Sequence, residues 1–177
     1  MKSFMHLMII LFCTVFSIIV HGQNSKTDTE IALFLKDNGN LSTLHYPKSV
    51  IRFYTQNNFE YAWVNVEQKS DQPEIAMLLL EYSYRSGLSL SDYHWGAISL
   101  RKLRELRNTP AEINQKEKAV FDIVMTDAFI TYINHLHFGK YNPSYNASYI
   151  DTNYIDGFRS DDVLLYASNC SITMKEL

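Results

Sequence analysis

The first side chain to consider as a catalytic nucleophile in this sequence is the thiol of Cys170. The only other cysteine, Cys13, lies in an apolar N-terminal run. A catalytic thiolate needs a general base and an oxyanion site beside it. Cys170 is flanked by Ser168, Asn169 and Ser171, with no glycine turn beside it and no histidine after it. We therefore expect Cys170 not to be a catalytic nucleophile, and the sequence offers no other catalytic residue.

Histidines are the next group that could do chemistry. His135 and His137 lie two residues apart in a predicted helix, a spacing that directs them to different helix faces. His94 falls in an expected loop, where spacing fixes no geometry. No His-Glu-x-x-His motif occurs in the chain. We expect these histidines to be ordinary surface and helix-end residues, and the sequence predicts neither a metal site nor a cofactor site.

A calcium loop is suggested by the segment from Asp151 to Gly157. An EF-hand loop places oxygen ligands at its first, third and fifth positions and glycine at its sixth. Counted from Asp151, the fifth residue is Ile155 and the glycine is the seventh. An apolar side chain would occupy a ligand position, so we expect no calcium site here.

Paired carboxylates could act as the acid and base of sugar hydrolysis. Asp122 and Asp127 lie five residues apart on a predicted helix, which places them on different sides. Asp161 and Asp162 have the sequence context of a helix cap. We expect all four to be structural residues.

Three regularly spaced tyrosines, Tyr141, Tyr145 and Tyr149, could stack on sugar rings. Pro143 interrupts the helix that would align them. Glycan binding by this tyrosine-rich segment is therefore kept as an alternative function.

Residues 1–22 have the pattern of a secretory signal peptide. Lys2 gives a positive start, the stretch 7–20 is apolar, and Gly22 is a small residue before a cleavage site at Gln23. The apolar run is shorter than the roughly 20 residues of a membrane-spanning helix. We expect export to the periplasm or cell envelope, with no membrane attachment after cleavage.

Cleavage would leave residues 23–177, which is the size of one ordinary domain. The remaining 15 basic and 19 acidic side chains give a net charge of −4. This charge argues against nucleic acid as a partner. With 12 Tyr, 10 Phe and 2 Trp in the chain, aromatic packing is the expected source of stability.

Hydrophobic periodicity predicts a mainly α fold, an irregular multi-helix bundle with a long central helix and little β structure. The longest helix is predicted over 112–138, buried along one face and ended by Gly139. The segment 59–64 is predicted to be extended and 141–157 to be a loop. The other helices are predicted to begin after 27–30, at Tyr46–Pro47, at Asp71, at Ser91–Asp92 and at 160–162.

The predicted helix that begins at Asp71 has an apolar stripe and is ended by Gly87. The stripe residues are Ile75, Leu78, Leu79 and Tyr82. Further apolar residues, Ala76, Met77 and Leu80, widen the stripe until little polar face remains, so we expect this helix to be central.

Four segments, in order, resemble the scaffold domain of large bacterial murein L,D-transpeptidases. Residues 53–64 resemble its FYxxRxFxPAWV stretch, and residues 86–94 resemble its GLxPxDYH turn. Residues 126–132 resemble its TDAFLxY helix, and residues 138–143 resemble the xGrxxP sequence at the end of that helix. The departures are at Asn58, where the family often has Gly, and at Tyr61 and Leu90, where it has Pro.

The resemblance implies structural roles for three residues. Trp63 would anchor an extended segment on the helices, Asp92 would cap the segment after Gly87, and Asp127 would tie the long helix to a neighbouring loop.

In the family that the chain resembles, catalysis belongs to a C-terminal module. That module uses a Cys in a Ser/Thr-His-Gly-Cys motif, and it makes 3→3 peptidoglycan cross-links through a thioester. This chain has no such motif, since its one His-Gly pair is His21–Gly22. We therefore expect a non-catalytic scaffold domain over residues 23–177, truncated at its C-terminal end, with a stand-alone paralogue of the scaffold as the alternative.

The expected partners follow from this resemblance. They are the missing catalytic domain or a homologous transpeptidase, and peptidoglycan itself. The alternative is an exported interaction or glycan-binding module that has no enzymatic partner domain.

Overall fold

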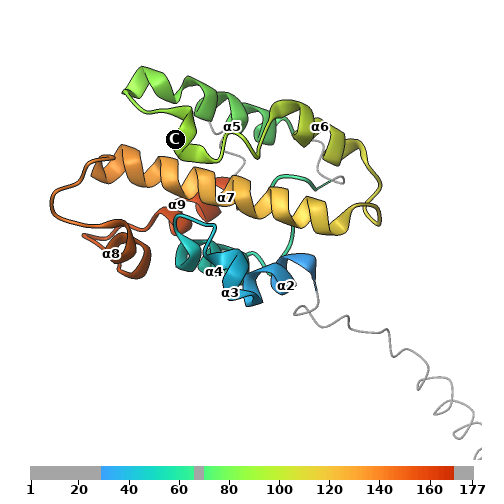
Figure 1. Cartoon of the computed structure of the whole chain (residues 1–177), viewed down its shortest axis with the longest axis horizontal. Helices are drawn as coiled ribbons and strands as arrows, with labels where there is room; N and C mark the ends of the chain where they lie inside the picture. Colours follow the sequence, from blue (N-terminus) through green and yellow to red (C-terminus); the bar gives the residue numbers. More distant parts are fainter. Residues whose placement is uncertain (1–28, 66–69, 170–177) are drawn as a thin grey trace, which may run out of the picture.

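The computed structural model describes residues 29–65 and 70–169 (Figure 1). The predicted signal peptide and Cys170 lie outside these residues. Within them the chain forms eight α-helices, two 3-10 helices and no strand, apart from an isolated bridge between Ile155 and Phe158. The helices are α2 (Glu30–Lys36), α3 (Asn38–Leu41), α4 (Pro47–Gln56), α5 (Gln72–Glu81), η2 (Tyr82–Ser86), η3 (Leu90–Tyr93), α6 (Leu100–Asn108), α7 (Gln115–Phe138), α8 (Ala147–Thr152) and α9 (Ser160–Asn169).

The prediction of a mainly α bundle around one long helix is confirmed. Helix α7 crosses the whole molecule in Figure 1, with α5 and α6 on one side of it and α2, α3 and α4 on the other. It contacts α2, α4, α9 and η3. No helix in the described ranges has the length and apolar character that a bilayer crossing requires.

Helix α7 is buried around most of its circumference, whereas the sequence predicted burial along one face. The predicted apolar face is largely buried, although Leu136 at its end is 48% exposed. Further residues outside this face are also buried: the polar Lys118, Asp122, Thr126, Asp127, Thr131 and Asn134, together with the apolar Ala119, Ile123 and Ile130. Hydrophobic periodicity cannot reveal burial of this kind, because it scores a polar side chain as exposed.

The predicted buried face of α5 is wrong. Leu78 and Tyr82 are 41% and 48% exposed, while Ala76, Met77 and Leu80 are buried. The sequence of α5 is apolar almost all round, so its pattern does not specify which face packs inward. The central position belongs to α7. The predicted end at Gly87 is confirmed, since η2 continues α5 and Gly87 adopts a left-handed conformation with φ 73°.

Several helix starts differ from the prediction. Helix α7 begins at Gln115, three residues later than predicted, after Asn114 in the left-handed region with φ 58°. Thr29 caps α2 by accepting a hydrogen bond from the Ala32 amide, and α3 follows directly. The segment predicted to begin at Ser91–Asp92 is divided into η3 and α6.

Helix α8 lies inside the predicted loop 141–157. It has six residues, too few to show a hydrophobic period. The Asn146 side chain caps it by accepting a hydrogen bond from the Tyr149 amide. The segment 59–64 was predicted to be extended, but it forms no strand: Phe59 lies in a turn with φ 57°, and Ala62 and Trp63 lie in a bend.

The start of α4 is capped by a residue that is distant in sequence. Tyr46, at the N-cap position, makes no side-chain capping bond. Instead, the Asp151 carboxylate of α8 accepts hydrogen bonds from the amides of Lys48 and Ser49 at 3.0 and 2.8 Å. Asp151 is 4% exposed. A carboxylate in this position satisfies two free amides and complements the positive end of the helix dipole.

We therefore expect Asp151→Ala to lower the free energy of unfolding by about 1–2 kcal/mol, the usual range for loss of a helix N-cap. Urea unfolding measures this loss. Asp37→Ala is the matched control, because Asp37 caps the four-residue α3 through the exposed Gly39 amide. We expect the control to lose less. Equal losses would contradict the capping role of Asp151.

Candidate functional site

Buried polar residues of α7 fix the loops around it, and Asp122 is one of those that are fully buried. One of its carboxylate oxygens accepts from the Tyr54 hydroxyl at 2.6 Å and the Ala62 amide at 2.9 Å. The other accepts from the amides of Trp63 and Val64 at 2.8 and 2.9 Å. Burial raises the pKa of Asp122, and the four hydrogen bonds oppose that rise. The side chain is fully buried and holds the segment 62–64 on α7.

Trp63 anchors the same segment, as the sequence predicted. It is 4% exposed and stacks on Phe129 of α7 with ring centroids 5.1 Å apart. Its indole N–H donates to the Thr126 hydroxyl at 2.9 Å. Helix α7 therefore covers the apolar surface of the indole and also accepts its hydrogen bond.

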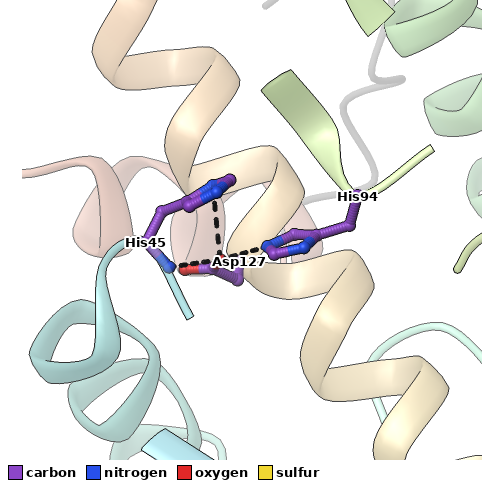
Figure 2. Close-up of side chains that lie close together, drawn as sticks. All are labelled: His45, His94 and Asp127. Carbon is purple, nitrogen blue, oxygen red and sulfur yellow. Dashed lines mark hydrogen bonds and ion pairs between the residues drawn. The ribbon is translucent and has the colours of Figure 1, made fainter. Parts of the chain in front are cut away.

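Asp127 ties α7 to two neighbouring loops, which confirms its predicted role and extends it. Its Oδ1 accepts from the Tyr46 amide at 2.8 Å, and its Oδ2 accepts from the His45 amide at 2.8 Å. Oδ2 also lies 2.7 Å from His94 Nε2 (Figure 2). Asp122 and Asp127 therefore hold different segments, as their five-residue spacing predicts.

The two histidines beside Asp127 form a cluster that the sequence did not predict. The rings of His45 and His94 are stacked, with centroids 4.4 Å apart and planes 16° from parallel. His45 Nδ1 lies 3.8 Å from Asp127 Oδ2 and 3.3 Å from the Thr131 hydroxyl. Burial is the main cause of a lowered pKa at His45. The three residues come from three separate segments, so no local motif signals the cluster.

The aspartate predicted to cap α9 has a different role. Asp161 is fully buried in the first turn of α9 and receives two hydrogen bonds from the Arg52 guanidinium, both at 2.9 Å. Arg52 also donates to the Asp151 carbonyl and the Ser49 hydroxyl. This side chain therefore joins α4 to α8 and α9. Asp162 pairs with Arg159 nearer the surface.

The prediction that Asp92 caps a helix is wrong. Ser89 occupies the N-cap position of η3 and makes no capping bond with its side chain. Asp92 instead forms an ion pair with Lys140 at 2.7 Å, which ties η3 to the residues just after α7. The Asp92 carboxylate therefore binds the distant Lys140 ammonium and not the nearby backbone amide that the sequence had predicted.

The remaining candidate histidines make packing contacts. His135 lies 3.1 Å from the Tyr93 hydroxyl, and burial is the main cause of its lowered pKa. His137 stacks on Phe158 with ring centroids 3.6 Å apart. The structure places neither near the Asp127 cluster as a ligand.

The segment that was compared with a calcium loop and the row of tyrosines have structural contacts. Asp151 caps α4, and Ile155 is buried, so this segment is used for packing. Tyr145 and Tyr149 stack with centroids 5.4 Å apart, whereas Tyr141 is 87% exposed.

A cavity of about 290 Å³ lies between α5, α7 and α9, close to the exposed Leu136. Its lining is mainly apolar: Leu79, Phe129, Tyr132, Ile133, Leu136, His137, Phe158 and Val163.

These observations define a class of protein, an all-helical domain whose buried aspartates hold its loops and helices in place. The model of the Scaffold domain family matches residues 48–168, which is more than half of the chain. The chain belongs to the Scaffold domain family. Searches of curated proteins and of solved structures found no match.

Proposed function

We propose that this chain is the non-catalytic scaffold domain of a peptidoglycan-cross-linking L,D-transpeptidase and acts in cell wall biogenesis. The membership of the Scaffold family and the four segments that resemble the transpeptidase scaffold support this proposal. Its expected location, from the N-terminal signal pattern, is the periplasm or cell envelope.

The observation that carries the proposal is that the four resembling segments bind one another. Residues 126–132 belong to α7, and the preceding turn of α7 supplies Asp122 to residues 53–64. Asp127 holds residues 86–94 through His94. Lys140 in residues 138–143 pairs with Asp92 in the same turn. The residues that carry the resemblance thus form one connected framework around α7.

The framework suggests that catalysis and positioning are carried out by different domains. In the family that the chain resembles, a cysteine of a separate module attacks a tetrapeptide and releases its terminal residue. The thioester formed is then passed to an amine of another stem peptide. The Scaffold domain would fix the position of that module relative to the peptidoglycan strands. The partner is therefore a transpeptidase catalytic domain, carried on the same polypeptide or on a homologous protein.

One observation favours the alternative, an exported module that binds an envelope partner or glycan without an enzyme. Tyrosines gather on the surface around α8, where Tyr149 and Tyr154 are 48% and 63% exposed, in addition to Tyr141. Exposed aromatic rings are suited to stacking on sugar rings.

An activity assay and a binding assay separate the two functions. We expect the purified chain alone to form no 3→3 product from a tetrapeptide donor and an acceptor stem, because it lacks the Ser-His-Gly-Cys sequence. Measurable turnover would refute the non-catalytic role. Retention of the folded chain on purified sacculi, lost in Tyr141→Ser and Tyr149→Ser, would instead favour glycan binding.

A further inference from the structure

We propose that His45, His94 and Asp127 form a binding site for a divalent transition metal ion, with Zn²⁺ the best match. The inference does not depend on the transpeptidase role. It rests on the convergence of three metal-ligating side chains from separate parts of the chain: the loop before α4, the residue after η3, and α7.

The spacing of the ligand atoms is suited to one small ion. The three candidate atoms all lie within 4.8 Å of one another. Asp127 Oδ2 is 2.7 Å from His94 Nε2 and 3.8 Å from His45 Nδ1. Ligands at about 2.0–2.2 Å from a tetrahedral Zn²⁺ lie about 3.4 Å apart. The two observed spacings fall on either side of this value, so His94 would need to move slightly away from Asp127 and the His45 nitrogen to approach it.

The carboxylate is already held in place. Asp127 is fully buried on the middle of α7, and the amides of His45 and Tyr46 donate to its two oxygens. Hydrogen bonds of this kind orient a ligand before the metal arrives. A fixed carboxylate loses little conformational freedom on binding the ion.

The side chains of His45 and His94 differ in how freely they can rotate. His94 Nε2 points at Oδ2, so a metal ion would take the place of the proton between these atoms (Figure 2). The His45 ring lies nearly parallel to that of His94, and it must turn for its nitrogen to face the same ion. Its side chain is 44% exposed, which permits that rotation and leaves a path for the ion and a water ligand.

The ligand types select the metal. Two imidazoles and one carboxylate are suited to Zn²⁺ and its neighbours in the transition series, whereas Mg²⁺ and Ca²⁺ prefer oxygen ligands throughout. Three protein ligands and one open position are also the pattern of zinc sites that retain a water.

Calorimetric titration of the purified chain with Zn²⁺ tests the proposal. We expect one ion at this site per chain and at least about tenfold weaker binding in His45→Gln, because a direct ligand is lost. His137→Gln is the matched control and should bind like the parent, since His137 is an exposed histidine away from the cluster. Circular dichroism checks that each variant is folded.

A second measurement needs no variant. Zn²⁺ that binds only the folded state should raise the melting temperature of the parent, and EDTA should reverse the rise. In His94→Gln this rise should be lost. The proposal is overturned if the parent neither binds Zn²⁺ nor gains thermal stability from it, or if a folded His45→Gln variant binds as tightly as the parent.

Discussion

The substitution Asp122→Asn should lower the free energy of unfolding by about 3–5 kcal/mol. The two side chains have nearly the same shape, so packing is unchanged, and the expected loss comes from the hydrogen bonds that the carboxylate accepts. The Asp122 carboxylate accepts four hydrogen bonds, three of them from the consecutive amides of Ala62, Trp63 and Val64. In Asp122→Asn one carboxylate oxygen is replaced by an NH₂ group, which cannot accept hydrogen bonds. The two donors that face this position then lose their acceptor. Each buried donor left without an acceptor costs about 1–3 kcal/mol.

Urea unfolding, followed by circular dichroism, measures this effect. Asp162→Asn is the matched control, because Asp162 is 39% exposed and pairs with Arg159 three residues earlier. Exposed ion pairs contribute about 1 kcal/mol or less, so the control should stay close to the parent. A loss of stability below 1 kcal/mol in Asp122→Asn would contradict the role given to this carboxylate.

The second large effect is expected at the contact between α4 and α9. Arg52→Met should lower the free energy of unfolding by about 2–4 kcal/mol. It removes both hydrogen bonds to Asp161, whose side chain is fully buried, and leaves that charge without its partner. Breaking one half of a buried ion pair typically costs 3–5 kcal/mol. We expect a smaller loss because the Arg52 side chain is 24% exposed.

Arg52→Lys should recover only part of the loss, since a lysine cannot make the two parallel bonds of a guanidinium. Lys102→Met is the control, because Lys102 pairs with the more exposed Glu105 and Glu117. Its stability should stay close to that of the parent. In a double-mutant cycle, Arg52→Met with Asp161→Leu should be more stable than Arg52→Met alone. If the two single losses simply add, the pair is not coupled.

Much of the helical architecture could be predicted from local signals. Pro47 at the start of α4 and Gly139 at the end of α7 mark helix boundaries through their own backbone preferences. The long apolar period of α7 predicted its length to within three residues. Asn58 has φ 56°, which explains why glycine is common at this position in the family that the chain resembles.

The errors at the predicted caps share a physical cause, which is that the deciding contact lies far away in sequence. Asp92 and Asp161 have the local context of caps, yet each binds a cation 48 or 109 residues away. The start of α4 is capped across 102–103 residues by Asp151. No local pattern encodes such pairs.

The candidate metal site was missed for the same reason. His45 stands alone in a short segment before α4, and only the fold brings it to His94 and Asp127. The role of Asp127 as a tie to a neighbouring loop could be predicted from the resemblance, but its second loop and the stacked histidines required the structure.

The most direct measurement is the rate of 3→3 cross-linking by an L,D-transpeptidase catalytic module with and without this chain. The module should carry the Ser-His-Gly-Cys motif and come from the same polypeptide or the same cell. If the chain is its scaffold, it should bind the module with saturable stoichiometry and raise the cross-linking rate, while the chain alone gives no product. Cross-linking by the chain alone, or the absence of both a complex and a change in rate, would contradict the scaffold role.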